Sequence, residues 1–397
     1  MAPPMKNPGR VRPAKAGRDL ALLGRETLPA LTGVREAAAF WVLAYHFGGD
    51  IFLLFPPARA LGPLVNGGYL GVDLFFQLSG FILAYNYLDR FRSFSSGAWL
   101  TFMKKRFARI YPVHFATLHI AALMSLIAGV TGLHLVSGAP SQYGLGAWLQ
   151  NILLVNGWWT LKPTCNDISW SISIEWFMYM AFPLLAFFVV RMKSWEWPLL
   201  AAAGCLLALL YGTIYLTAQE ILVNGGGWLG GAIPCGVLGF LTGVMLFSAR
   251  RFLRPSPAWG WISTATAIGL AIIPWFFDIS EFMSGMLVIP LFAVLILALS
   301  FGNGPAAALL SSRTFVWWGD ASFSLYMTSS ITHMLVTGLL PWKWLAQAGL
   351  PVRLACILFI GAVIAGITVA TYRWIDLPWR RRLRNLPCLN SPDRGSR

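Results

Sequence analysis

The sequence predicts an all-α protein that crosses a membrane about ten times, with both termini in the cytoplasm. Hydrophobic residues make up 57 % of the 397 residues and charged residues only 11 %, whereas a soluble chain carries about a quarter charged residues. Basic residues also gather between alternate apolar segments. This asymmetry is the one that orients membrane helices.

Ten apolar segments are long enough to cross a bilayer, which takes about 20 apolar residues in a helix. They cover roughly residues 34–55, 69–88, 110–135, 168–190, 197–218, 232–249, 258–278, 284–301, 315–340 and 352–374. A further apolar piece, residues 144–157, is too short to cross and is interpreted as interfacial or re-entrant.

The positions of the basic residues orient these segments. With ten spans and the N-terminus inside, 26 of the 30 Lys and Arg residues lie on the cytoplasmic side. The four exceptions are Arg59, Lys162, Lys343 and Arg353. The net charge of +15 therefore follows from the positive-inside rule and does not call for a nucleic-acid partner.

The remaining composition divides the chain into three regions. Residues 1–27 are basic and rich in Pro and Gly, lack the apolar core of a signal peptide, and are predicted to be a disordered cytoplasmic tail. Residues 28–384 are predicted to form one transmembrane domain and residues 385–397 a second cytoplasmic tail. The five cysteines have neither metal-ligand nor disulfide spacing, so no metal site is predicted.

An ionisable side chain lies deep in the first apolar segment. His46 follows Arg35 by eleven residues, which places it about 16 Å deeper at the helical rise of about 1.5 Å per residue. It is interpreted either as a neutral tie between helices or as a functional group. Asp73, near the outer end of the second segment, is the carboxylate expected to orient or charge His46.

A dense cationic patch, MKKRFARIYP, precedes the third apolar segment. Its residues Arg106 and Arg109 are three apart and share one helix face. Guanidinium groups bind phosphate oxygens in bidentate fashion, so this pair is a candidate phosphate clamp. The same charges also suit topology signalling or anionic lipid binding, and charge alone leaves these interpretations open.

The fourth segment begins with the polar sequence NDISWSISIEWFMY. Glu175 lies about 10 Å below its outer end, and Tyr179 follows one turn later. An intramembrane glutamate is either functional or an interhelical tie, for example to Tyr179 or a histidine. Trp170 and Ser171 of this sequence, and Tyr326 of the polar ninth segment, are candidate substrate-binding residues.

Taken together, these features resemble the membrane-bound acyltransferase-3 family, which O-acylates glycans and related exported molecules. The matching features are the spacing of Arg35 and His46, the sequence GVDLFFQLSGF, the pair Arg106-x-x-Arg109 before IYP, and SWSISIEWFMY. The later sequences GDASFSLYM and YRWIDLP match further family elements in the same order. The resemblance covers about residues 28–384.

Two departures concern the last two segments. The family usually places a histidine soon after the late YL pair, whereas here Thr328 and Ser329 occupy those positions and His333 comes later. The final acidic residue, usually glutamate, is Asp376. The sequence therefore leaves the roles of His333 and Asp376 open.

The resemblance implies an integral membrane O-acyltransferase in a bacterial cytoplasmic membrane, surrounded by lipid. Acyl-coenzyme A, in the simplest case acetyl-coenzyme A, would be its co-substrate, with no permanently bound cofactor. A carbohydrate, exported or lipid-linked, would be its acceptor. The implied catalytic residues are His46, Glu175 and Asp73, the implied donor-binding residues are Arg35, Arg106 and Arg109, and the implied substrate-binding residues are Ser171, Trp170, Tyr179 and Tyr326.

Two mechanisms and a rival function remain open. His46 would act either as general base on the acceptor hydroxyl or as a covalent acyl relay. The rival is a transporter or flippase of a lipid-linked sugar, in which the intramembrane His, Asp and Glu form a proton relay. Against it, the sequence shows no internal repeat of the kind many transporters have.

Overall fold

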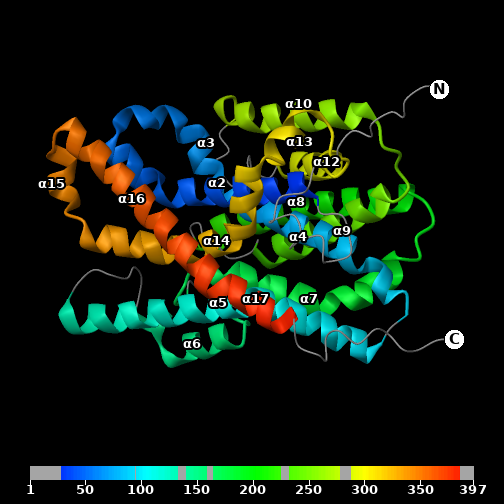
Figure 1. Cartoon of the computed structure of the whole chain (residues 1–397), viewed down its shortest axis with the longest axis horizontal. Helices are drawn as coiled ribbons and strands as arrows, with labels where there is room; N and C mark the ends of the chain where they lie inside the picture. Colours follow the sequence, from blue (N-terminus) through cyan, green and yellow to red (C-terminus); the bar gives the residue numbers. More distant parts are fainter. Residues whose placement is uncertain are drawn as a thin grey trace, which may run out of the picture.

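The computed structural model describes residues 28–93, 95–132, 140–158, 164–224, 232–277 and 288–384. Both predicted terminal tails lie outside these ranges. The regular elements within the ranges are helical, as the sequence predicts, and no strand occurs there. The α-helices are α2 (Pro29–Leu54), α3 (Gly62–Asn66), α4 (Gly71–Tyr87), α5 (Ser96–Thr131), α6 (Leu145–Ile152), α7 (Ser169–Val189), α8 (Glu196–Asn224), α9 (Ala232–Arg250), α10 (Pro257–Ile272), α12 (Ile289–Leu299), α13 (Gly304–Leu310), α14 (Arg313–Leu339), α15 (Trp342–Gln347), α16 (Leu350–Thr371) and α17 (Leu377–Arg384) (Figure 1).

Among the described residues, six helical segments are long and apolar enough to cross a membrane. They are Pro29–Leu54, Pro56–Phe91, Ser96–Thr131, Ser169–Val189, Pro257–Trp275 and Leu350–Arg382. A seventh span results if α12 and α13, which meet at 86°, are counted as one. Six of the ten predicted segments thus coincide with candidate spans, while the count of ten and the cytoplasmic termini stay predictions.

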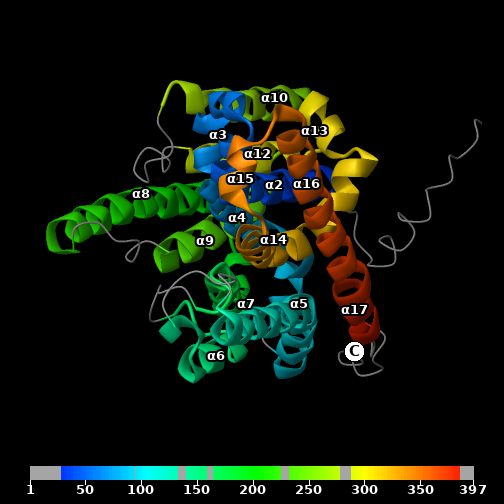
Figure 2. The same cartoon turned by 90° about the vertical axis from the view of Figure 1, so that its left-hand side faces the viewer.

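The predicted spans 197–218 and 232–249 fall on α8 and α9. The apolar parts of these helices are Glu196–Gly212 and Gly236–Arg250. In Figure 2, α8 extends away from the body of the molecule. The predicted span 284–301 falls largely on α12, the first half of the bent pair.

The predicted span 315–340 corresponds to α14, which contacts α2, α5 and α16. Every residue from Ala321 to Thr332 is buried. Several hydroxyl groups in this stretch return to the helix's own carbonyls, as Ser322 does to Gly319 at 2.8 Å. Because protein rather than lipid surrounds α14, its polar side chains can bond to neighbouring helices. These same side chains make its composition too polar to mark a span.

Helices α2 and α14 run side by side in the same direction. Near their beginnings Gly319 lies so close to Thr32 that a Cβ atom would come within 2.1 Å of the Thr32 carbonyl oxygen. Further along, His333 of α14 reaches Asp50 of α2. The missing side chain at Gly319 therefore allows the close backbone approach that brings polar groups of the two helices together.

Helix α4 contacts α9 in a similar way. A Cβ atom on Gly80 would come within 2.0 Å of the Phe240 carbonyl oxygen. The missing side chain of Gly80 therefore allows the two helices to approach closely.

Apolar side chains cover the outside of the molecule. Leu126 on α5, Leu207 on α8 and Leu358 on α16 are 65 %, 65 % and 75 % exposed, respectively. Such surfaces are costly in water and suit contact with lipid tails. The protein is therefore an integral membrane protein.

The basic patch lies inside a long helix rather than in a loop before one. Helix α5 begins at Ser96, whose preceding residue Ser95 caps it by accepting a bond from the Ala98 N–H, so Arg106 and Arg109 lie in its third and fourth turns. Figure 1 shows α16 crossing the molecule diagonally toward α17, which lies beside α5. The short helix α6 also packs on α5, where Tyr111 donates to the Ile152 carbonyl at 3.2 Å. Its eight residues span only about 12 Å, in agreement with a segment too short to cross.

Candidate active site

A cavity of about 170 Å³, here called the arginine pocket, lies between α2, α4, α5, α7 and α14. Its polar lining residues are Thr32, Arg35, Ser79, Arg106, Arg109, Ser171, Glu175, Ser322 and Tyr326. Six of them were predicted as site residues from separate parts of the sequence. The fold thus brings the predicted donor-binding arginines, one predicted catalytic carboxylate and two predicted substrate-binding residues to one cavity.

Aromatic side chains hold Arg106 at the pocket. Its Nη2 donates to the Tyr87 hydroxyl at 3.1 Å. Its guanidinium carbon lies 5.1 Å from the ring centroid of Tyr87 and 5.8 Å from that of Tyr179, within the range of cation–π attraction. Its Nε is buried and makes no hydrogen bond to any part of the chain that the structure describes.

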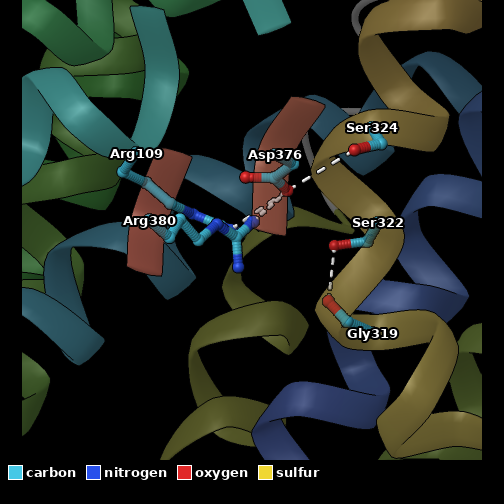
Figure 3. Close-up of polar contacts among 6 residues, drawn as sticks. All are labelled: Arg109, Gly319, Ser322, Ser324, Asp376 and Arg380. Carbon is cyan, nitrogen blue, oxygen red and sulfur yellow. Dashed lines mark hydrogen bonds and ion pairs between the residues drawn. The ribbon is translucent and has the colours of Figure 1, made fainter. Parts of the chain in front are cut away.

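An ion pair holds Arg109 (Figure 3). Its Nη1 lies 3.6 Å from Oδ2 of Asp376, too far for a hydrogen bond. Arg380 also pairs with this carboxylate, and Ser324 donates to it at 3.4 Å. Within the described ranges, Arg109 Nη1 is buried and lacks a hydrogen-bond acceptor.

Arg373 lies three residues before Asp376, a spacing at which the two side chains would pair on a regular helix. A π-helical turn, Tyr372–Asp376, joins α16 to α17. Along this wider turn Arg373 is exposed and Asp376 is buried. The two side chains therefore lie on different sides, and Asp376 faces α5 and α14 instead.

Glu175 belongs to the arginine pocket. Its Oε1 accepts hydrogen bonds from Ser79 Oγ at 2.5 Å and from the Tyr179 hydroxyl at 2.6 Å. It also interacts electrostatically with Arg35 and Arg106. The predicted tie between Glu175 and Tyr179 is present, and the carboxylate balances part of the positive charge of the arginines.

The predicted substrate-binding residues differ in position. The hydroxyl groups of Ser171 and Tyr326 lie 2.8 Å apart at the pocket wall, joining α7 to α14. Tyr179 faces the pocket arginine Arg106 through its ring. Trp170 is not among the lining residues and packs against Phe76, with 6.2 Å between ring centroids.

A second polar group, the histidine cluster, consists of His46, Asp50, Asp167, Ser330 and His333. His333 Nε2 lies 2.9 Å from Oδ2 of Asp50. Ser330 Oγ donates to Oδ1 of Asp167. Asp167 and His333 are the titratable groups that act electrostatically on His46. The cluster thus joins α2, α14 and the residues just before α7.

Asp73 lies apart from these interactions. It is buried in the first turn of α4 and interacts with its own backbone N–H, at a helix N-terminus where negative charge is favourable. The residues that act on His46 are Asp167 and His333. An orienting role of Asp73 toward His46 stays a prediction.

Sequence reasoning missed Asp50 altogether. It follows His46 by four residues on the same helix, so the two share a face. A search along the same helix for polar residues on the face of His46 would therefore have found Asp50. The pairing with His333 has no such signal, because it depends on how α2 and α14 pack.

The two sites suit different ligands. Among the described residues, no group of three or more His, Cys, Asp or Glu side chains is arranged to hold a metal ion. The arginine pocket is instead suited to an anion, since guanidinium N–H groups there lack acceptors.

These features define an integral membrane protein with an arginine-lined pocket and a separate pair of histidines. The family of acyltransferase domains known as acyltransferase-3 matches residues 28–372. The chain belongs to this family and is an enzyme that transfers acyl groups.

Relatives of known name support the same assignment. Acyltransferase MdmB of Streptomyces mycarofaciens is 29 % identical over 398 residues, covering 92 % of this chain and 95 % of that protein. Peptidoglycan O-acetyltransferase OatA of Listeria monocytogenes is 24 % identical over 388 residues, covering 90 % of this chain and 56 % of that protein. O-acetyltransferase OatA of Staphylococcus aureus is 25 % identical over 176 residues, which is 41 % of this chain and 25 % of that protein. No solved structure matches the chain.

Proposed function

We propose that this protein is an O-acyltransferase of a bacterial cytoplasmic membrane. It moves an acyl group, acetyl in the simplest case, from cytoplasmic acyl-coenzyme A to a hydroxyl of an exported or lipid-linked carbohydrate. The observation that carries the proposal is the arginine pocket, in which Arg35, Arg106 and Arg109 converge beside Glu175. Its excess of positive charge suits the phosphates of the donor.

Buried N–H groups without hydrogen-bond acceptors support an anionic ligand in the arginine pocket. A guanidinium group has five N–H donors, and buried donors are normally paired. Arg106 Nε and Arg109 Nη1 are buried without acceptors in the described chain. Phosphate oxygens would supply these acceptors in charge-assisted bonds.

The size of the pocket limits how much of the donor it holds. Its volume of about 170 Å³ is below the roughly 300–1,000 Å³ of sites that enclose drug-sized molecules. The pocket would therefore enclose one part of acyl-coenzyme A. The acyl end would reach toward His46, which lies about 16 Å beyond Arg35 along α2.

The site residues then divide into those that bind the acyl donor and those that carry out the transfer. Arg35, Arg106 and Arg109 bind the donor, and Glu175 passes a proton from water to the departing thiolate. His46 acts as general base on the acceptor hydroxyl or first takes the acyl group itself. Asp73 keeps the catalytic role that the family resemblance implies. The implied substrate-binding role is kept by Ser171, Trp170, Tyr179 and Tyr326.

Two further arguments support the proposed orientation of the protein in the membrane and the proposed carbohydrate acceptor. The positive-inside rule places the arginines on the cytoplasmic side, where acyl-coenzyme A is made. One relative that covers most of this chain is named a peptidoglycan O-acetyltransferase, which favours a carbohydrate acceptor. The proposed partners are therefore acyl-coenzyme A, the carbohydrate acceptor and the surrounding membrane lipids.

A reconstituted assay tests the proposal. Purified protein in liposomes would be given labelled acetyl-coenzyme A and extracts of cell-surface polysaccharide. We expect label to appear in alkali-labile esters of the polysaccharide. Mass spectrometry of polysaccharide from cells with and without the gene should show the same ester lost. If the protein leaves acyl-coenzyme A intact with every acceptor extract, the proposed donor is wrong.

A further inference from the structure

The histidine cluster contains a second imidazole, that of His333, which the proposed function leaves without a role. We propose that the Asp50–His333 pair is the base that takes the proton from the acceptor hydroxyl, while His46 carries the acyl group. This inference rests on the proposed function and deepens it. It places the acceptor hydroxyl at the histidine cluster and decides between the two mechanisms left open for His46.

The geometry of the pair is that of a carboxylate-oriented imidazole. His333 Nε2 lies 2.9 Å from Oδ2 of Asp50. A neutral imidazole has one N–H donor and one acceptor nitrogen. The carboxylate therefore fixes the proton on Nε2 and leaves Nδ1 as the acceptor, and it stabilises the imidazolium that forms when Nδ1 takes a proton. Phe47 packs edge-on against the ring, at 4.9 Å between centroids, and limits its rotation.

The pair is accessible, as a base that meets an external substrate must be. The side chains of His333 and Asp50 are 32 % and 19 % exposed. His114 on α5 provides the contrast, because it is fully buried and its Nε2 is bonded to the Asn151 carbonyl. His114 has the features of a structural histidine, and His333 does not.

One face of α14 connects this pair to the arginine pocket. Tyr326, Ser330 and His333 are spaced at intervals of four and three residues, so they share a face. Tyr326 lines the pocket, and His333 lies about 10 Å further along the helix. The parallel helix α2 carries Arg35 at the pocket and His46 and Asp50 at the cluster. An acyl group that leaves the pocket along these helices therefore meets His46 and then the pair.

The chemistry balances in two steps. In the first, a ring nitrogen of His46 attacks the thioester carbon, the C–N bond forms, and the C–S bond breaks. The thiolate stays attached to the rest of the donor, which the arginines hold, and takes a proton from water. In the second, the acceptor oxygen attacks the acyl carbon, the C–O bond forms, the C–N bond breaks, and the hydroxyl proton passes to His333 Nδ1. The proton then leaves to water, and the Asp167 carboxylate near His46 favours the positively charged acyl-imidazole between the steps.

The two steps can be measured separately in proteoliposomes. Exchange of labelled coenzyme A into acyl-coenzyme A, without acceptor, reports the first step alone. In His333→Ala we expect this exchange to stay near the wild-type rate. Transfer to the polysaccharide should fall by about 10²–10⁴, the usual contribution of a general base. Imidazole added outside should restore part of the transfer, because the pair is accessible.

Two variants serve as controls. His333→Gln retains a side chain that can hydrogen-bond to Asp50 and should lose transfer to the same extent while keeping the exchange. His119→Ala removes a partly exposed histidine of α5, whose Nδ1 is bonded to the Phe115 carbonyl, and should change neither reaction. The amount of folded protein in the membrane is measured for each variant.

Three results would overturn the inference. One is transfer by His333→Ala within a few-fold of wild type. Another is loss of exchange together with transfer in both His333 variants. The third is wild-type protein that transfers acyl groups but shows no exchange, which would remove the relay role of His46 and leave the acyltransferase function intact. Failure of the proposed function itself is distinct, because wild-type protein would then neither exchange nor transfer.

Discussion

Arg109 of α5 and Asp376, at the junction of α16 and α17, form an ion pair with 3.6 Å between Nη1 and Oδ2. The carboxylate is buried, at 1 % exposure, and also pairs with Arg380. The C-terminal helix is thereby fixed against α5, and the orientation of one pocket arginine depends on a residue far along the chain. A charged side chain buried inside a membrane protein is costly unless it pairs with another charged or polar group, as Asp376 does here.

Replacing Asp376 by Asn should destabilise the protein. The substitution keeps the size of the side chain but leaves two arginines without their carboxylate, and removing one partner of a buried ion pair costs about 3–5 kcal/mol. We expect a lower unfolding temperature in detergent. Arg373→Gln is the matched control, since Arg373 is exposed on the same turn. Equal unfolding temperatures for the two variants would show that the pair does not stabilise the fold.

Changing Arg106 to Lys should raise the apparent KM for acyl-coenzyme A. An ammonium group is a point charge and cannot replace a planar fork that binds phosphate in bidentate fashion and stacks on the Tyr87 ring. The same substitution at Arg109 should act in the same direction. Arg382→Lys is the matched control, because it makes the same arginine-to-lysine change at an exposed position of α17, outside the pocket. Unchanged donor dependence in both pocket variants would return these arginines to a topological or lipid-binding role.

A His46→Gln change should abolish acyl transfer without preventing insertion. Glutamine approximates the size and hydrogen bonding of histidine but transfers no proton near neutral pH and carries no acyl group. The expected loss is at least about 10²-fold. Transfer of labelled acyl group is measured, with membrane protein quantified in parallel. If activity stays within a few-fold of wild type, His46 is a structural tie and neither base nor relay.

Cysteine labelling tests the orientation. Gly146 on α6 has no neighbour within 4 Å of an added Cβ atom, so Gly146→Cys should be tolerated and should react from outside. Lys193→Cys, at an exposed site after α7, should react only from inside. The same side for both would contradict the ten-span topology.

The native thiol near α6 should not obscure this experiment. Burial raises the pKa of Cys165 to about 11. Below that pH the group is mainly the neutral thiol, whereas alkylation needs the thiolate. At neutral pH we therefore expect slow labelling of Cys165. The labelling of the unchanged chain is the background measured before the variants are compared.

The sequence by itself determined the all-helical membrane class, because apolar length and charge asymmetry are local properties of the chain. It also determined that Arg106 and Arg109 share a face, since helical spacing fixes that relation. Whether residues 315–340 cross the membrane stays a prediction, because α14 is long enough to cross but is absent from the candidate spans that length and composition identify.

Only the tertiary structure decided which polar groups meet. Glu175 met Tyr179 and the arginines rather than a histidine, Asp376 met Arg109 rather than Arg373, and His333 met Asp50. These relations depend on the offset and distance between packed helices, which small-residue contacts such as that of Gly319 with Thr32 set. A periodic pattern places a side chain on one helix face, but the partner across that face comes from a segment whose position only packing defines.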